Sequence, residues 1–332
     1  MRKLNDLAKA GALLFVFDAS DSVIGTLTDG DIRRGLLGDL NMTDSVTSFM
    51  NPNFRFMLEA DRNTQKIKEL KAQLIRYVPL LDANKKLLDV LDLSTYSAML
   101  PLDAIIMAGG MGKRLLPLTE NIPKPLLKVG EKAILDHNLD RLSSFGISQF
   151  HISVNYLGEK IKNHVGTGAE RNSSVHYITE TEPLGTIGAA RLVKSFLHPE
   201  ILIMNSDLLT NIDFEDFYRV FSDSNAEMAV ATIPYHVDIP YAVMEIEGTN
   251  DVRFFKEKPR YTYYSNAGIY LLKKEVLKLI PSNKKFDATD LMDILIKEKR
   301  KLISYPILSY WLDIGKMEDY QKAQADIQHL KL

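Results

Sequence analysis

Asp103-Ala-Ile-Ile-Met-Ala108-Gly-Gly-Met-Gly-Lys-Arg114 is the stretch of sequence that decides the fold. It begins with an apolar run of strand length, Asp103 to Ala108, and a glycine-rich loop follows this run directly. Gly109, Gly110 and Gly112 carry no side chains, so the backbone N–H groups of the loop can approach phosphate oxygens. The stretch therefore predicts a phosphate-binding loop after a buried strand.

Cationic side chains follow the loop. Lys113 and Arg114 add positive charge, and an arginine can grip a phosphate group through two parallel N–H donors. Lys124 stands between Pro123 and Pro125, which restrict the backbone on both sides of the lysine. This combination of strand, glycines, arginine and proline-flanked lysine favours phosphate binding over an ordinary tight turn.

Two commoner nucleotide-binding loops do not match this stretch. A Walker loop ends in Gly-Lys followed by serine or threonine, whereas Lys113 is followed by Arg114. A dinucleotide-binding loop requires an acidic residue at a strand end about 20 positions further on. Glu131 stands in a polar turn instead.

Strands and helices alternate from the loop to the C-terminus. Expected strands lie around residues 150–154, 175–178, 201–204, 228–232, 243–246 and 267–271. Expected helices lie around residues 133–145, 187–196, 214–222 and 290–299. The alternation predicts an α/β domain over residues 101–332, with a Rossmann-like, mostly parallel mixed sheet and helices on both faces. Ligands are expected at the carboxyl ends of the strands.

An imperfect internal repeat precedes this domain. The first copy predicts strands at 13–17 and 23–27 and a helix that begins near Thr28. The second copy predicts a helix at 64–72 and strands at 77–81 and 87–91. Residues 1–98 are therefore expected to form a small α+β module, with a linker over 94–101.

The N-terminus loosely imitates a signal peptide, because Arg2 and Lys3 precede the apolar run 11–17. Asp6 and Lys9 interrupt the approach to that run, and no small-residue cleavage site follows it. We interpret the segment as a helix that leads into a buried strand.

The composition excludes several classes of function. A chain of 332 residues suits two domains, and its 41 basic and 43 acidic residues give no indication of a nucleic-acid surface. The absence of cysteine excludes disulfides, thiolate zinc sites and a cysteine nucleophile, and it fits a cytoplasmic protein. No apolar run approaches the roughly 20 residues needed to span a bilayer, so we expect no membrane partner.

Two aspartates stand where strands are expected to end. Leu202-Ile-Met-Asn-Ser-Asp207 is an apolar strand with a polar end, and Trp311-Leu-Asp313-Ile-Gly315 is an apolar step before a glycine turn. Magnesium binds a few carboxylate oxygens together with water and phosphate. From composition alone, such aspartates are more often helix caps or turn formers.

The glycine loop and Pro123-Lys-Pro125 together resemble the signature of the sugar-phosphate nucleotidyltransferases. This family includes glucose-1-phosphate thymidylyltransferases and mannose-1-phosphate guanylyltransferases. The resemblance covers residues 103 to about 325. It departs from the family at Lys113, where threonine is more frequent.

The resemblance implies a set of site residues. Asp207 and Asp313 match the two metal-ligand motifs, which implies bound Mg²⁺. Catalysis is assigned to Arg114, Lys124 and Asp207. The nucleotide-binding residues implied are Ala108, Gly109, Gly110, Gly112, Lys113, Arg114, Glu182, Gly185 and Thr186. The sugar-phosphate-binding residues implied are Lys124, Glu257, Lys258 and Asn266, and Phe286 to Asp290 is a weaker match to an acidic sugar-pocket segment.

The implied reaction joins a nucleoside triphosphate and a sugar-1-phosphate into a nucleotide sugar and releases pyrophosphate. Our preferred substrates are GTP and glucosamine-1-phosphate, because the pairing of this domain with the N-terminal module resembles guanylyltransferases of that sugar. The alternatives are mannose-1-phosphate guanylyltransferase and glucose-1-phosphate thymidylyl-, cytidylyl- or uridylyltransferase. More distant alternatives are a glycosyltransferase of similar fold and a sensor with an inactive transferase domain.

Gly25-Thr-Leu-Thr28-Asp-Gly-Asp31 resembles a cystathionine-β-synthase (CBS) domain, in which the threonine and the aspartate contact a nucleotide. The resemblance implies Thr28 and Asp31 as regulatory contacts to an adenine nucleotide. The first copy starts late, which indicates a truncated N-terminus, and the second copy lacks the threonine–aspartate pair. A purely dimerising role fits the module equally well, and we expect a homo-oligomer.

Overall fold

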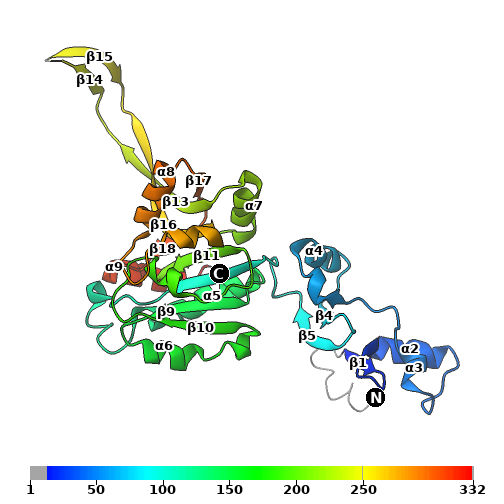
Figure 1. Cartoon of the computed structure of the whole chain (residues 1–332). Coiled ribbons are helices and arrows are strands. Elements are labelled where there is room, and N and C mark those ends of the chain that lie inside the picture. Colours follow the sequence, from blue (N-terminus) through cyan, green and yellow to red (C-terminus); the bar gives the residue numbers. More distant parts are fainter. Residues whose placement is uncertain (1–12, 249, 331–332) are drawn as a thin grey trace. The chain divides into compact units, whose positions relative to one another are not determined.

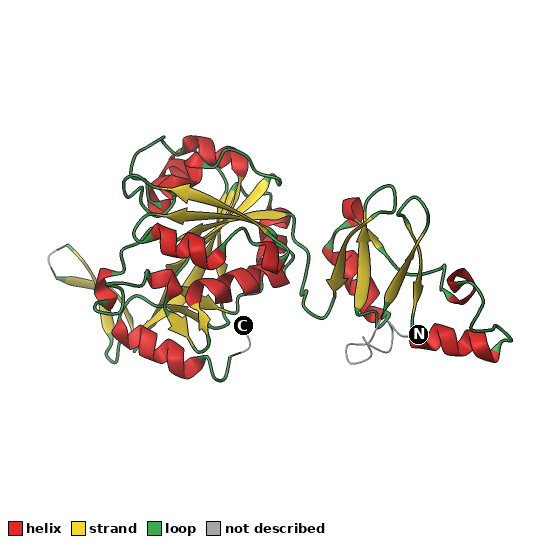
Figure 2. Cartoon of the chain, turned by 90° about the horizontal axis from the view of Figure 1, so that it is seen from below, coloured by secondary structure: helices red, strands yellow, loops and turns green. Residues whose placement is uncertain are grey.

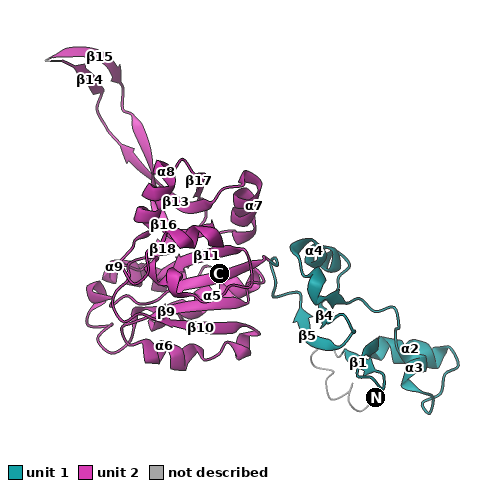
Figure 3. Ribbon diagram, viewed as in Figure 1, with its two compact units in different colours: residues 1–99 teal, residues 100–332 magenta. Residues whose placement is uncertain are grey.

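The computed structural model describes residues 13–248 and 250–330. The chain divides into two compact units, Met1–Met99 and Leu100–Leu332 (Figure 3). The division falls inside the segment expected to be the linker. The helix expected ahead of the first strand lies outside the described residues.

The described part of the larger unit is built on a seven-stranded sheet (Figure 1). The strand order is β10 (Ser174–Thr179), β9 (Gln149–Val154), β6 (Leu102–Met107), β11 (Glu200–Asn205), β16 (Arg260–Lys273), β13 (Met228–Asp238) and β17 (Leu302–Pro306). β16 runs antiparallel to both of its neighbours, and all other neighbouring pairs are parallel. The mostly parallel mixed sheet predicted from the sequence is confirmed.

Helices cover both sides of this sheet (Figure 2). They are α5 (Ile134–Ser144), α6 (Gly158–Val165), α7 (Phe214–Ser224), α8 (Ala288–Lys297) and α9 (Met317–Asp326). Asp213 caps α7, because its side chain accepts hydrogen bonds from the amides of the first turn. Among residues 13–248 and 250–330, no helix is both long and apolar enough to cross a bilayer.

One expectation about these elements is wrong. The helix expected at 187–196 is only a short 3₁₀ helix, Gly188–Leu192. The amides of Ile187 and Gly188 at its start donate to the Phe286 carbonyl, which ties this segment to the chain just before α8. The strand expected at 243–246 is confirmed as β14 (Val243–Glu247), which pairs with β15 (Asp251–Lys256) outside the main sheet.

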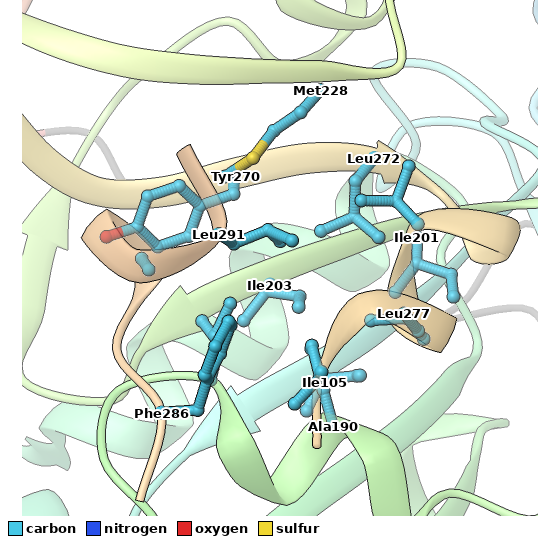
Figure 4. Close-up of a cluster of buried hydrophobic side chains, with 14 of the residues drawn as sticks. Ile105, Ala190, Ile201, Ile203, Met228, Tyr270, Leu272, Leu277, Phe286 and Leu291 are labelled. Atoms are coloured by element: carbon cyan, nitrogen blue, oxygen red, sulfur yellow. The ribbon is translucent and has the colours of Figure 1, made fainter. Parts of the chain in front are cut away.

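One apolar core fills the space between the sheet and α8 (Figure 4). Ile201 and Ile203 of β11 point to the same face of the sheet, since side chains alternate along a strand. Ile105 of β6 and Tyr270 of β16 join them, and Leu291 of α8 covers them. Burial of this face stabilises the sheet. The sheet in turn fixes the positions of the strand ends from which the loops begin.

The smaller unit contains two strand groups and three α-helices among its described residues. β1 (Leu14–Phe17) pairs with β2 (Val23–Leu27), and β3 (Met57–Leu58), β4 (Tyr77–Leu81) and β5 (Leu87–Asp92) form a second sheet. The helices are α2 (Asp29–Leu37), α3 (Val46–Phe49) and α4 (Thr64–Ala72). Each group therefore combines paired strands with a helix, as the internal repeat predicts.

We predict that Ile203→Ala lowers the free energy of unfolding of the larger unit by about 2 to 5 kcal/mol, because it leaves a cavity in the core. Ile296→Ala is the matched control, since Ile296 on α8 is 62% exposed, and it changes that free energy by at most about 0.5 kcal/mol. Urea unfolding followed by the fluorescence of Trp311, the single tryptophan of the chain, measures this unit. Equal losses for both variants would contradict the described core.

Candidate active site

A cavity of about 310 Å³ lies where the carboxyl ends of β6, β10 and β11 meet the loops that follow them. This is the edge of the sheet at which the sequence predicts a ligand. The cavity is lined by Met107, Gly109, Gly110, Lys124, Pro125, Glu180, Pro183, Leu184, Gly185, Thr186, Asn205, Ser206 and Asp207.

The glycines of the first loop are required for different reasons. Gly112 has a left-handed backbone with φ of 63°, and a Cβ atom there would lie 2.9 Å from Cγ2 of Thr119. A Cβ atom on Gly109 would lie 2.7 Å from Oε1 of Glu180. A Cβ atom on Gly110 would meet no protein atom within 4 Å. Packing therefore requires glycine at positions 109 and 112. At Gly110, the missing side chain instead leaves the backbone open to the cavity.

Lys124 lies at the base of the cavity and is only 8% exposed. Its ammonium group forms an ion pair with Oδ2 of Asp207 and lies 3.9 Å from Oδ1 of Asp313. The two carboxylates meet because β12 (Leu208–Thr210) pairs antiparallel with β18 (Trp311–Asp313), with Leu208 opposite Asp313. Residues far apart in sequence thus form one charged cluster.

The environment of Asp313 disfavours an uncompensated charge. Burial and the Asp207 carboxylate raise the pKa of Asp313, whereas the cations of Lys124 and Arg114 act to lower it. Oδ1 of Asp313 is buried and has no hydrogen-bond partner among the described residues. A buried carboxylate oxygen without a donor is a position that a cation can fill.

Arg114 lies beside the same cluster. A Cβ atom on Gly315 would come within 3.6 Å of Nη2 of Arg114, so the guanidinium group packs against the turn that follows Asp313. Arg114 and Asp207 therefore flank the same aspartate rather than lying on opposite sides of the unit. Lys113 is exposed, and neither cation is in the lining of the cavity.

The opposite wall of the cavity is fixed to the start of α8. The Thr186 amide donates to Asp287 at 2.9 Å, and the hydroxyl of Thr186 accepts from the Ala288 amide at 2.8 Å. Gly185 has a φ of 80°, and a Cβ atom there would lie 2.6 Å from the Phe286 carbonyl oxygen. Gly185 and Thr186 line the cavity, whereas Glu182 is exposed outside its lining.

Sequence reasoning missed Glu180 and Asn205, which also line the cavity. The buried Glu180 carboxylate accepts hydrogen bonds from the Ser153 hydroxyl and from the Leu184 amide, so it ties the loop that contains Leu184 to strand β9. The side chain of Asn205 packs against Gly268. A Cβ atom on Gly268 would lie 2.6 Å from the side-chain nitrogen of Asn205. Each is a polar residue at the end of a buried strand, which was the available signal.

Three predicted sugar-phosphate residues do not line the cavity in this structure. The Asn266 amide group donates to the Tyr270 hydroxyl at 2.9 Å, and its oxygen accepts from the Gly268 amide. Glu257 and Lys258 are exposed between β15 and β16, on a two-stranded extension that leaves the sheet (Figure 1). The β13–β16 pairing continues beyond the sheet and carries these two residues outward.

The remaining predicted residues have local partners. Ala108 is buried directly beneath the glycine loop. In the smaller unit, Thr28 caps α2 and donates to Asp31 at 2.6 Å, and the Asp31 amide donates back to the Thr28 hydroxyl. Arg34 also forms an ion pair with Asp31. In this structure, Thr28 and Asp31 serve to start a helix.

Residues 103–329 match the family model described as nucleotidyl transferase. The chain belongs to the nucleotidyl transferase family. The match falls within the larger unit, so the cavity just described is the candidate active site of a nucleotidyl transferase.

Three known proteins illustrate what this nucleotidyl transferase chain is similar to. It is 30% identical over 232 residues to the mannose-1-phosphate guanyltransferase of Saccharomyces cerevisiae, with 65% of this chain and 62% of that protein covered. It is 30% identical to the D-glycero-alpha-D-manno-heptose 1-phosphate guanylyltransferase of Aneurinibacillus thermoaerophilus, with 69% of this chain and 99% of that protein covered. HddC from Yersinia pseudotuberculosis complexed with GMP-PN is 28% identical, with a TM-score of 0.53 and coverage of 68% and 99%. The chain thus spans about 62% of the length of the yeast relative.

We predict that Gly109→Ala lowers the free energy of unfolding of the larger unit by about 1 to 3 kcal/mol, because the new methyl group displaces buried Glu180. The matched variant Gly110→Ala leaves that free energy within about 0.5 kcal/mol of the parent chain. Urea unfolding monitored through Trp311 compares the two. A loss at Gly110 as large as that at Gly109 would show that the loop is packed otherwise.

Proposed function

We propose that the larger unit transfers a nucleotidyl group from a nucleoside triphosphate to a sugar-1-phosphate and releases pyrophosphate. One observation carries the proposal: the open backbone at Gly110 faces the same cavity as Lys124 and Asp207. Packing of the protein does not require glycine at this position, whereas close approach of a phosphate group does.

Residues in the cavity, together with Arg114 beside it, suit this reaction. A sugar phosphate oxygen attacks the α-phosphorus, the new P–O bond forms, and the bond to the β-phosphate oxygen breaks. The attacking oxygen is already ionised at neutral pH, so no side chain has to remove a proton. Catalysis then consists of alignment and charge neutralisation, in which the loop amides and Arg114 hold the leaving pyrophosphate and Lys124 holds the reacting phosphates.

We propose Asp207 and Asp313 as the residues that hold Mg²⁺. The fit rests on the buried Asp313 oxygen without a hydrogen-bond donor and on the second carboxylate beside it. Among the described residues, no group of three or more histidine or acidic side chains is arranged to hold a metal. A pair would suffice for Mg²⁺, which binds proteins through one or two carboxylates and would here supply positive charge against the substrate phosphates.

GTP is the proposed nucleotide, since the names of two similar proteins specify guanylyl transfer and a third was solved with GMP-PN. Glucosamine-1-phosphate remains our proposed acceptor, because the pairing of this domain with the N-terminal module resembles guanylyltransferases of that sugar. The names of the relatives favour mannose-1-phosphate or a heptose 1-phosphate as the alternatives. Contacts to the sugar from Asn266, Glu257 and Lys258 are proposed on the family motif alone, and the cytoplasmic location stays a prediction.

For the smaller unit, we propose a structural role. Thr28 and Asp31 satisfy each other within the cap of α2, which supports this role over adenine-nucleotide sensing.

The substrate class is tested by pyrophosphate release from GTP, ATP, CTP, UTP and dTTP with a panel of sugar-1-phosphates in the presence of Mg²⁺. We expect release with GTP and one hexosamine, hexose or heptose 1-phosphate. The same mixture without the sugar phosphate is the control. Release that does not depend on a sugar phosphate, or no release with any pair, would contradict the proposed function.

We predict that Asp207→Asn lowers turnover by about 100-fold or more, because one of the two carboxylates at the proposed metal site is lost. Asp223→Asn on the exposed surface of α7 is the control and keeps parental turnover. Pyrophosphate release measures turnover, and Trp311 fluorescence verifies that both variants are folded. Near-parental turnover of Asp207→Asn would rule out the metal role.

A further inference from the structure

A second cavity, of about 490 Å³, lies at the edge of the main sheet. One side is formed by β9 and by β10, the edge strand (Figure 1), and the other by the end of the short 3₁₀ helix and the chain after it. We call it the histidine cavity, and its volume is in the range of sites for small organic ligands. It is lined by His151, His176, Tyr177, Ile178, Thr179, Leu192, Val193, Lys194 and Ser195.

The histidine cavity contains a buried imidazole group without a partner in the protein. His151 is only 6% exposed, and its ring stacks on that of His176 with the centroids 5.4 Å apart. Nε2 of His151 lies 4.0 Å from Oδ2 of Asp103, which is beyond hydrogen-bond distance. Among residues 13–248 and 250–330, neither ring nitrogen of His151 has a hydrogen-bond partner. A buried polar group that finds no partner in the protein requires one in the cavity.

The lining of the histidine cavity is rich in hydrogen-bond donors. Among the described residues that line it, none is acidic. Lys194 is exposed and forms no ion pair with a described residue, and the hydroxyl groups of Thr179 and Ser195 add donors to those of the two imidazole rings. Such a lining suits an anion with several acceptor oxygens, of which a phosphate group is the commonest. The apolar part of the lining is Ile178, Leu192 and Val193.

The histidine cavity shares two walls with the candidate active site. On β10 and the chain after it, Thr179 lines the histidine cavity, and the next residue, Glu180, lines the active-site cavity. On the other side, a single segment of chain runs from Thr186 in the lining of the active-site cavity to Ser195 in the lining of the histidine cavity. The two cavities are therefore neighbours, and both depend on the position of this segment.

Hydrogen bonds fix the segment at both ends. The amides at its start donate to the carbonyl of Phe286. Just beyond its end, the Leu197 amide and the His198 ring donate to the buried Asp103 carboxylate, both at 2.7 Å. A ligand in the histidine cavity contacts the chain between these two anchors, so it acts on the same segment that places Thr186 in the active-site cavity.

We propose that the histidine cavity binds a phosphate group, either free or carried by a small organic molecule, and that its occupancy changes the affinity of the neighbouring site for GTP. The imidazole groups and Lys194 contact the phosphate oxygens, and the apolar part of the lining contacts the organic part of the ligand. The coupling is reciprocal, because a ligand that changes the affinity for GTP has its own affinity changed by GTP to the same extent. This second part rests on the proposed function, since it requires GTP in the active-site cavity.

The site is tested by isothermal titration of the full-length chain with glucose 6-phosphate, inorganic phosphate and glucose. We expect binding of one or both phosphate probes and none of glucose. Lys194→Met should weaken binding about tenfold or more, because it removes a charged donor from the lining. Arg191→Met is the matched control, since Arg191 is an exposed cation on the same segment but outside the lining, and it should change the Kd less than about twofold.

Lys124→Met distinguishes the two cavities. Binding that Lys194→Met weakens and Lys124→Met retains is binding in the histidine cavity. Binding weakened by Lys124→Met alone would overturn the proposal, and so would a lack of binding of both phosphate probes. Tighter binding of glucose 6-phosphate than of inorganic phosphate identifies a phosphate monoester as the ligand, and equal binding identifies the free ion.

Nitrogen-15 NMR of the imidazole groups locates the probe without any substitution. The ring signals of His151 and His176 should shift during the titration, whereas the ring signal of His236, which is exposed on the outer part of β13, should not. Unchanged signals of His151 and His176 at a saturating concentration of the probe would overturn the site.

The coupling is tested by measuring the Kd for GTP with and without a saturating concentration of glucose 6-phosphate or inorganic phosphate. We expect a change of about fivefold or more in the parent chain and none in Lys194→Met. An equal Kd with and without the probe would overturn the coupling. A chain that binds no GTP would contradict the proposed function instead, whereas the histidine cavity is tested by the titrations with its own probes.

Discussion

The ammonium group of Lys124 forms an ion pair with Asp207 and lies 3.9 Å from a carboxylate oxygen of Asp313. The rest of the larger unit brings these three side chains together. Each comes from a different segment: a proline-flanked turn, the end of β11 and the end of β18. Burying like charges together is costly, and burial and Asp207 accordingly raise the pKa of Asp313. Lys124 and Arg114 together balance these two carboxylates, so a polyphosphate that entered the cavity would need a further cation to balance its charge. This need is the physical basis of the proposed metal site.

The glycine loop lines the same cavity, and the structure shows a different reason for glycine at different positions of the loop. Gly109 and Gly112 allow the loop to pack against Glu180 and Thr119. Gly110 instead keeps backbone accessible. A loop with open backbone at Gly110 that lines the same cavity as Lys124 and Asp207 suits a polyphosphate ligand, and a purely structural turn would not need that accessibility.

Features that depend on local sequence could be predicted, and features that depend on distant pairing could not. The strands 77–81 and 150–154, the helix 64–72 and the glycine loop follow from residue patterns over short windows. The approach of Asp207 to Asp313 depends on the pairing of β12 with β18, which spacing does not reveal. The outward course of Glu257 and Lys258 likewise follows from the pairing of β13 with β16. Glu180 was not predicted, because a single acidic residue after a strand does not match any motif.

The proposed binding of a divalent ion by Asp207 and Asp313 is tested by a crystal structure of the chain with Mn²⁺ and a non-hydrolysable GTP analogue, using the anomalous signal of manganese. We expect an anomalous peak at coordination distance, about 2.2 Å, from carboxylate oxygens of both Asp207 and Asp313, with the phosphates against the amides of residues 109–112. A manganese peak remote from these carboxylates, or phosphates bound away from the glycine loop, would contradict it.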